Sequence, residues 1–127
     1  MTIAHITLAT RNVAQTCDFF ARTLGWQPIN RPGNITAKAA WLEIAPGQEL
    51  HLLEIEAYEP TAFEREYGRH IALEIPLAEF DSLKKRLVDA SAEIIAPERA
   101  TPFERFFFRG PDGYVFEVVD SGRPSKT

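Results

Sequence analysis

Apolar and polar residues follow a pattern that predicts the same order of secondary structure twice along the chain. Residues 3–9 are rich in β-branched and apolar types, which is typical of a strand. The apolar spacing then becomes helical, with Asn12 suited to cap the helix and Gly25 suited to end it. Two apolar runs, 39–45 and 49–55, flank a PGQ turn and predict a hairpin. The first half therefore reads as strand, helix and three strands.

The second half of the chain repeats this order. It contains an apolar strand pattern, a helical pattern, a short strand and a final hairpin around a PDG turn, at 69–75, 77–91, 93–96, 104–110 and 114–120. The first strands of the two halves also match in residue type, because AHITLA in one corresponds to RHIALE in the other. The pattern predicts an α+β fold in which two tandem βαβββ modules form a curved mixed sheet.

Each predicted helix should bury one apolar face against its strands. In the first helix this face is formed by Val13, Cys17, Phe20 and Leu24, and in the second by Leu77, Phe80, Leu83 and Leu87. Cys17 is the only cysteine in the sequence and fits a small core residue. We expect no internal disulfide.

Length and composition are typical of one globular domain spanning residues 1–127. The first module covers about 2–56, a polar and aromatic connector covers 57–68, and the second module covers about 69–120. A chain of this length buries a sizeable core, so it needs no structural metal to be stable. Any metal that it binds is therefore expected to serve chemistry.

Charge and hydropathy narrow the range of partners. The formal net charge is -4 and the basic residues are scattered, which argues against nucleic acid. No apolar run has the length of a membrane span, and no leader pattern is present at the amino terminus. We expect a soluble, cytoplasmic protein that acts on a small molecule.

All three histidines of the chain lie on predicted strands, and their spacing follows the repeat. His5 and His51 are 46 residues apart, and His70 and Glu117 are 47 apart. Because side chains on a strand alternate between its faces, His5 and His70 should point away from the apolar residues that pack on the helices. We expect all four side chains on the concave side of the sheet, around one cavity.

Three imidazoles and one carboxylate form a donor set that divalent ions of borderline softness accept. A cation would also satisfy a buried Glu that otherwise lacks a partner. The sequence therefore predicts one divalent ion, either Zn, Ni, Co, Fe or Mn, bound by His5, His51, His70 and Glu117. The rest of the cavity is expected to be largely apolar. Its lining should consist of Thr7, Leu53, Val115 and Val119 with some of Trp41, Phe106, Phe107 and Phe108.

The role of His51 depends on the register of its strand. Glu49, His51 and Leu53 share one face, whereas Leu50 and Leu52 share the other. Glu49 lies about 7 Å along the strand from His51, which we interpret as too far for both to bind one ion. A shift by one residue would turn His51 outward and leave three ligands.

Three segments resemble a known family. The segments AHITLATRNVAQTCDFFARTLGW, GRHIALEI and FFFRGPDGYVFEVVD are similar to the vicinal oxygen chelate superfamily, which includes glyoxalase I, methylmalonyl-CoA epimerase, extradiol dioxygenases, and fosfomycin and bleomycin resistance proteins. The resemblance covers residues 2–120. It implies paired βαβββ modules and, often, a homodimer. It also implies that His5, His70 and Glu117 occupy the three recurrent ligand positions, with His51 near the fourth.

Two positions depart from the pattern of microbial glyoxalase I. The resemblance implies an Arg four residues after the first ligand and an Asn four residues after the second, but this chain has Ala9 and Ile55. Both departures put glutathione in doubt as a substrate component. Arg11 replaces the missing Arg only if its side chain faces the cavity.

The resemblance and the donor set favour a metal-dependent lyase or isomerase of the glyoxalase I type. In such an enzyme the ion holds two oxygens of a small chelating carbonyl substrate and stabilises an enediolate. Glu117 is the candidate catalytic base. Glu74 shares the predicted cavity face of His70 and is a second candidate.

Other functions stay open. His5, His70 and Glu117 match the facial triad of an Fe(II) extradiol-type dioxygenase, although many of those enzymes use two such domains. His51 would then act as an acid or base near the ion. A non-catalytic protein that binds a drug or another small molecule is a further alternative, but bleomycin resistance proteins generally lack the metal ligands. Thiol transfer to an epoxide also belongs among the alternatives.

Overall fold

The computed structural model of the protein describes residues 1–34 and 38–124. The chain forms two compact units, Met1–Glu59 and a second unit that begins at Pro60. The first contains β1 (His5–Thr10), α1 (Val13–Thr23), β2 (Gln27–Ile29), β3 (Ala39–Ala45) and β4 (Gln48–Glu54). The second contains β5 (Ile71–Ile75), a 3-10 turn (Leu77–Glu79), α2 (Phe80–Asp89), β6 (Glu93–Ile95), β7 (Arg105–Arg109) and β8 (Val115–Asp120).

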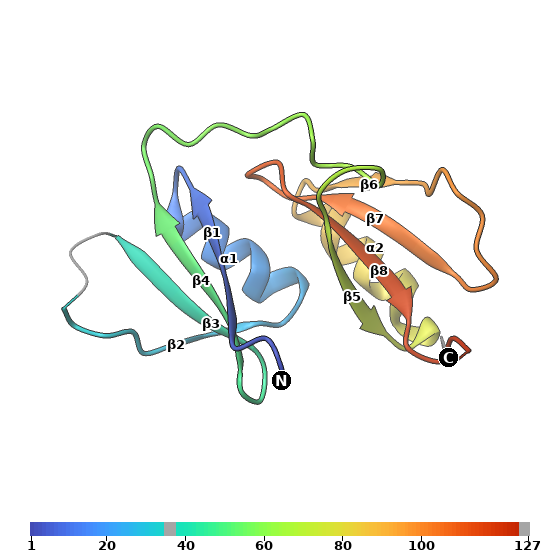
Figure 1. Ribbon diagram of the computed structural model, residues 1–127, viewed down its shortest axis with the longest axis horizontal. Coiled ribbons are helices and arrows are strands. Elements are labelled where there is room, and N and C mark those ends of the chain that lie inside the picture. The colour runs from blue at the N-terminus through green and yellow to red at the C-terminus, as the bar shows by residue number, and fades with distance from the viewer. Residues whose placement is uncertain (35–37, 125–127) are drawn as a thin grey trace. The chain divides into compact units, whose positions relative to one another are not determined.

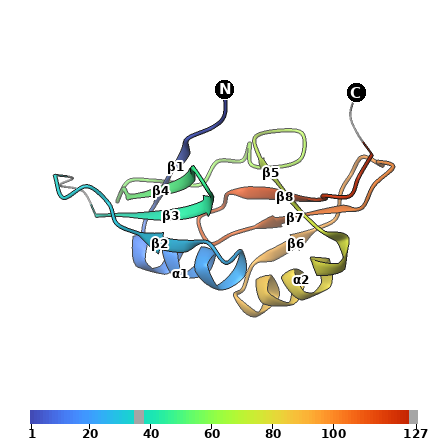
Figure 2. The same cartoon turned by 90° about the horizontal axis from the view of Figure 1, so that it is seen from below.

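The predicted fold class is confirmed, with the strands arranged as two four-stranded mixed sheets. The order is β1-β4-β3-β2 in the first unit and β5-β8-β7-β6 in the second. In each sheet the first strand pairs in parallel with the last, and the other pairs are antiparallel. Within each unit one helix covers one face of its own sheet (Figures 1 and 2). None of the described helices is long and apolar enough to cross a membrane.

Both predicted ends of α1 are confirmed. The side chain of Asn12 accepts a hydrogen bond from the backbone N–H of Gln15, which satisfies one of the free donors at the helix start. The Glu54 carboxylate of β4 accepts a second hydrogen bond, from the N–H of Val13. Gly25 follows the helix with a φ of +75°, a conformation that favours glycine.

The buried face of α1 differs from the predicted one. Phe20 is buried as expected, but Cys17 is only half-buried, and the face is completed by Thr16, Phe19 and Thr23. The two threonines tolerate burial because their hydroxyls are satisfied: Thr16 bonds the hydroxyl of Thr10 at 2.7 Å, and Thr23 donates to the carbonyl of Phe19 at 2.7 Å. Apolar spacing alone does not reveal such hydroxyl bonds.

In α2, Phe80, Leu83 and Leu87 are buried as predicted. Leu77 is not, because it begins a 3-10 turn and therefore does not follow the α-helical phase of the other three. Its side chain remains exposed.

The strand register confirms the repeat at the level of single residues. In the first unit Thr7, two residues after His5, pairs with His51. In the second unit Ala72, two residues after His70, pairs with Glu117. His51 thus occupies in the first sheet the position that Glu117 occupies in the second.

The predicted connector is largely built into the second unit. The Glu64 side chain is 1% exposed and accepts hydrogen bonds from Arg69 and from the backbone N–H of Val115. The Glu66 carboxylate accepts from the backbone N–H groups of Glu98 and Arg99. Residues 60–68 are therefore held to the rest of the second unit by the buried Glu64 and the hydrogen-bonded Glu66.

The register of β4 can be tested by two neighbouring leucines. Leu52 is fully buried on the helix side of the sheet, and Leu53 is half-buried on the other side. We expect Leu52→Ala to lower the free energy of unfolding by about 2–5 kcal/mol, because it leaves a cavity in the core. Leu53→Ala should cost clearly less. Urea unfolding measures both, and equal losses would contradict the register.

Candidate functional site

Two of the predicted ligands lie together on the first sheet. The imidazole of His51 stacks on that of His5 with the ring centroids 4.0 Å apart, and on the indole of Trp41 at 3.9 Å. Leu50 and Leu52 are buried on the opposite side of β4. The predicted alternation of this strand is therefore confirmed, and His51 is held between two rings on the face away from α1.

Glu49 contacts His51 directly, which corrects one expectation. Its Oε1 atom lies 2.8 Å from His51 Nε2. The sequence spacing placed the two residues too far apart to share an ion, but that estimate compared backbone positions. Both side chains are long enough to bend along the strand until their polar atoms meet. Glu49 therefore belongs to the group of polar residues around His51.

The other two predicted ligands lie together on the second sheet. His70 comes directly before β5 rather than within it. Its Nε2 atom is 3.2 Å from Glu117 Oε1, and its Nδ1 atom is 3.2 Å from the carbonyl oxygen of Arg65. The edge of the His70 ring packs against Phe107 with the centroids 5.3 Å apart. Both ring nitrogens of His70 therefore face oxygen atoms.

This arrangement has a chemical consequence. A backbone carbonyl only accepts hydrogen bonds, so Nδ1 of His70 must carry a proton and donate it to Arg65. In a neutral imidazole Nε2 then presents a lone pair, and it faces a carboxylate oxygen of Glu117 that also presents lone pairs. Two acceptors at this separation require either a proton shared between them or a metal ion.

The residues fit a metal ion. Two donor atoms at about 2.1 Å from one ion lie roughly 3.0 Å apart at a right angle and roughly 3.4 Å apart at a tetrahedral angle. The observed separation of 3.2 Å between His70 and Glu117 falls between these values. The bond from Nδ1 to Arg65 also matches the outer contact by which proteins orient ligating histidines.

A buried arginine holds the other oxygen of Glu117. Arg105 Nη1 lies 2.9 Å from Glu117 Oε2, and Arg105 Nη2 lies 2.9 Å from Glu66 Oε2. Burial alone would lower the pKa of Arg105, but its hydrogen bonds to the two carboxylates raise that pKa above its ordinary value. Burial would likewise raise the pKa of Glu66, whereas hydrogen bonds from the N–H of Glu98, from Arg105 and from the N–H of Arg99 lower it below its ordinary value.

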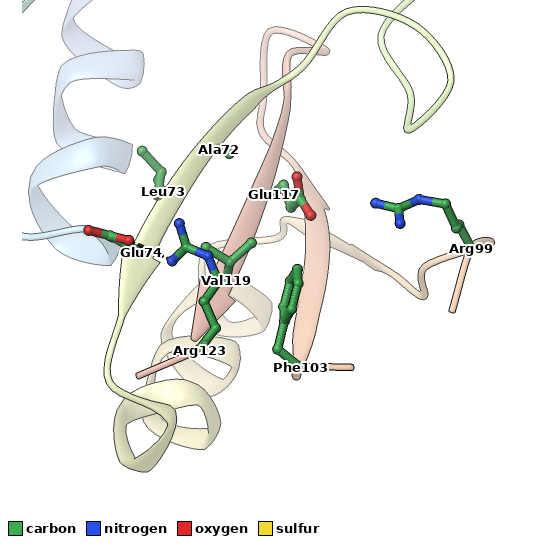
Figure 3. Close-up of a pocket in the computed structure, with 8 residues that line it drawn as sticks. All are labelled: Ala72, Leu73, Glu74, Arg99, Phe103, Glu117, Val119 and Arg123. Carbon is green, nitrogen blue, oxygen red and sulfur yellow. Dashed lines mark hydrogen bonds and ion pairs between the residues drawn. The ribbon is translucent and has the colours of Figure 1, made fainter. Parts of the chain in front are cut away.

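A cavity of about 370 Å³ opens beside Glu117 within the second unit (Figure 3). Its lining consists of Ala72, Leu73, Glu74, Arg99, Phe103, Glu117, Val119 and Arg123. Glu74 is paired with Arg123 at 2.6 Å and shares the cavity with Glu117, as the predicted faces required. Phe106 is absent from this lining and packs instead against Phe80 of α2, so it does not face the site.

The four predicted ligands thus occur as two pairs, each within one unit. Across residues 1–34 and 38–124 there is no group of three or more His, Cys, Asp or Glu side chains close enough to hold an ion together. Binding of one ion by all four residues stays a prediction.

A family model for the glyoxalase/bleomycin resistance protein/dioxygenase superfamily matches residues 2–118. The chain belongs to this superfamily. It is 25% identical over 122 residues to Glyoxylase I 4 of Arabidopsis thaliana, covering 91% of this chain and 68% of that protein. It is also 25% identical over 122 residues to the metallothiol transferase FosB of Shouchella clausii, covering 91% and 77%.

Solved structures of the superfamily share the fold. A glyoxalase/dioxygenase from Nostoc punctiforme has a TM-score of 0.78 at 20% identity, covering 96% of this chain and 92% of that one. The fosfomycin resistance protein FosX of Listeria monocytogenes, in a complex with Mn(II) and a dihydroxypropylphosphonic acid, has a TM-score of 0.76 at 23% identity, covering 94% and 91%.

Arg11, the possible replacement for the Arg that the glyoxalase I resemblance implies at position 9, is bound by other residues. Arg11 is exposed, and its Nε atom donates to the carbonyl of Tyr58 while Nη2 lies 3.8 Å from Glu59. The side chain is therefore engaged by residues at the end of the first unit. With these contacts Arg11 does not replace the Arg that the glyoxalase I pattern has at the position of Ala9.

Sequence reasoning missed Arg105 and Glu66. Alternation along ERFFFRG places Arg105 on the same strand face as Phe107, which pairs with Glu117, so a charged residue facing the predicted ligand was detectable. Glu66 gave no such signal, because it lies in a loop 39 residues before its partner.

The lowered pKa of Glu66 gives a stability test. A carboxyl whose pKa is lower in the folded state stabilises the fold above its unfolded pKa, about 4.3, and that contribution is lost as the pH falls through the folded value. We expect Glu66→Gln to lower the free energy of unfolding by about 1–3 kcal/mol at pH 7. Urea unfolding should show this difference shrinking from about pH 5 downward.

Glu93 provides the matched control. It forms an exposed ion pair with Arg109, so Glu93→Gln should change stability by at most about 1 kcal/mol. A difference between the wild type and Glu66→Gln that is as large at pH 3 as at pH 7 would contradict the assignment.

Proposed function

We propose that the protein is a metal-dependent lyase or isomerase of the glyoxalase I type. In this proposal His5, His51, His70 and Glu117 bind one divalent ion. The observation that carries it is the pair of facing acceptors, His70 Nε2 and Glu117 Oε1, at 3.2 Å. A metal ion resolves that contact while leaving the imidazole neutral, the form in which it binds metals.

The donor set and the relatives support a transition metal. Imidazole and carboxylate together suit Zn, Ni, Co, Fe and Mn. One relative is named a metallothiol transferase, and one similar structure contains Mn(II). When bound, the ion would polarise two oxygens of a chelating carbonyl substrate.

The proposed roles of the acidic residues follow from their contacts. Oε2 of Glu117 is held by Arg105, so Oε1 is the oxygen directed toward His70 and the proposed ion. Glu74 is the second candidate base, because it lines the same cavity and is more than half exposed, with Arg123 holding one of its oxygens. Both residues lie within reach of a substrate in the cavity.

The cavity suits a small organic substrate. Its volume of about 370 Å³ lies at the lower end of the range typical of small-molecule sites. Phe103 and Val119 give it an apolar wall beside the charged groups. We also propose that the protein is a homodimer, in line with the family resemblance.

Two other reactions are testable alternatives. Thiol transfer to an epoxide is favoured by the similarity to the metallothiol transferase, which spans 91% of this chain. An Fe(II) dioxygenase would use His5, His70 and Glu117 as its triad and leave His51 beside the ion. A non-catalytic binding protein would bind a ligand without turnover.

The metal site can be tested by substitution. We expect about one divalent ion per chain in the wild type, measured by elemental analysis and calorimetric titration. His5→Ala, His70→Ala and Glu117→Gln should each weaken binding by more than about 100-fold, beyond the usual cost of losing an outer contact. His51→Ala should weaken it less if His51 is not a direct ligand.

Glu93→Gln is the control for these variants, since it removes an exposed carboxylate of the second unit without touching the pairs. Wild-type stoichiometry in His5→Ala, His70→Ala and Glu117→Gln together would refute the metal site.

The reaction class can be tested on each metal form. We expect isomerisation of hemithioacetals formed from several thiols, with no oxygen uptake. Glu117→Gln and Glu74→Gln should separate the two candidate bases, because only loss of the base should reduce turnover in protein that still contains metal. Oxygen uptake by the iron form with a catechol, or thiol addition to an epoxide, would replace the proposed reaction.

A further inference from the structure

Building on the proposed metal site, we infer that Arg105 is a positioning residue that orients Glu117 so that Oε1 faces His70 and the proposed ion. Through the same guanidinium it also ties the loop 96–104, which forms part of the cavity wall, to that ligand. The inference concerns residues of the second unit alone.

Arg105 is built into the protein rather than placed on its surface. Its side chain is 3% exposed, and Phe107 lies beneath its guanidinium at 5.2 Å from the ring centroid. The two terminal nitrogens bind Glu117 and Glu66, one carboxylate each. Its Nε atom is the one buried side-chain polar atom without a hydrogen-bond partner among the described residues. An arginine buried in this way has lost hydration, so its remaining bonds restrict it strongly.

The bond to Glu117 decides which oxygen is available. Nη1 of Arg105 occupies Oε2 at 2.9 Å, while Oε1 faces His70 at 3.2 Å. A carboxylate held in this manner keeps Oε2 turned toward Arg105 and presents Oε1 to an ion beside His70. Arg105 therefore sets the orientation of Glu117.

The same guanidinium holds the cavity wall. Nη2 of Arg105 donates to the carbonyl of Arg99 as well as to Glu66. Glu66 in turn accepts from the N–H of Glu98 at 2.7 Å and from the N–H of Arg99 at 3.1 Å. The backbone at 98–99 is thus fixed on both its donor and its acceptor side. Figure 3 shows Arg99 and Phe103 of this loop on the cavity beside Glu117.

A purely electrostatic role of Arg105 and a positioning role predict opposite changes in metal affinity when Arg105 is replaced. Arg105 is a cation close to the proposed ion, so removing its charge should strengthen binding if only electrostatics mattered. If Arg105 positions Glu117, removing it should weaken binding, as the loss of outer contacts to metal ligands usually does. The sign of the change therefore separates the two roles.

The first measurement is metal affinity, by competition between the purified protein and a chelator for zinc or nickel. We expect Arg105→Lys to weaken binding about 10-fold and Arg105→Gln about 10- to 100-fold. Lysine keeps the charge but cannot bridge two carboxylates with a planar fork, so it tests geometry even if Arg105→Gln fails to fold. Unchanged or tighter binding in Arg105→Lys would overturn the inference.

Arg109→Gln is the matched control. Arg109 lies on the same strand and the same face as Arg105, but it pairs with Glu93 and with the carbonyl of Gly113. Its substitution should leave metal affinity within about 2-fold of the wild type. A loss as large as that of Arg105→Lys would mean that any change on β7 disturbs the site, and the inference would fail.

The second measurement is hydrogen exchange at the amides of residues 98 and 99. In metal-free protein we expect faster exchange in Arg105→Lys and Glu66→Gln than in the wild type. Added metal should slow exchange at these amides in the wild type and much less in Arg105→Lys. Exchange that is equal in all three proteins, with and without metal, would refute the link between the loop and Glu117.

The two proposals fail in different ways. A wild type that binds no metal removes the proposed function, while exchange in the metal-free variants still reports whether Arg105 holds the loop. A wild type that binds metal, with Glu117→Gln impaired and Arg105→Lys normal, keeps the proposed function and removes the role of Arg105.

Discussion

The second unit depends on how the negative charge of Glu117 is compensated on both sides. One oxygen, Oε2, accepts a hydrogen bond from the buried Arg105. The other, Oε1, faces Nε2 of His70, while Nδ1 of the same ring faces the carbonyl oxygen of Arg65. Burying a carboxylate between an apolar sheet and a cavity is costly unless each oxygen has a positive or donating partner. Arg105 provides one partner, and a shared proton or a metal ion would provide the other on the His70 side. The cavity and its loop are arranged around this requirement.

At the equivalent position of the first unit the side chain is an imidazole instead of a carboxylate. His51, the equivalent of Glu117, lies between the rings of His5 and Trp41 and contacts Glu49. The first sheet therefore holds its site residue by ring stacking and one carboxylate, whereas the second holds it by a buried ion-pair network. The two units share the backbone register, and the side chains around each position determine how the polar group is oriented.

Sequence predicted the parts of this structure that depend on periodicity. The strand faces of His5, His51 and Glu117 follow from period two and a fixed register, and these were correct. The predicted burial of Leu77 was wrong because a 3-10 turn interrupts the helical phase. The contact between Glu49 and His51 was not predicted, because spacing along the backbone does not show how far side chains reach along a strand. Alternation along β7 places Arg105 on the face of Glu117, but the contact of Arg105 with Glu66 joins a strand to a loop 39 residues away, so no local pattern specifies it.

The bond between Arg105 and Glu117 also limits which reaction the site can perform. With Oε2 held by Arg105, Oε1 is the oxygen of Glu117 that is directed toward both tasks, metal ligation and proton transfer. An oxygen that ligates an ion has its basicity reduced by that ion. In a lyase or isomerase the proton would then be moved more effectively by a separate carboxylate, and Glu74 is the acid in the same cavity that retains solvent access. Thiol transfer and dioxygenation form no enediolate and need no carboxylate to take a proton from carbon, so a large contribution of Glu74 to turnover would favour the proposed reaction.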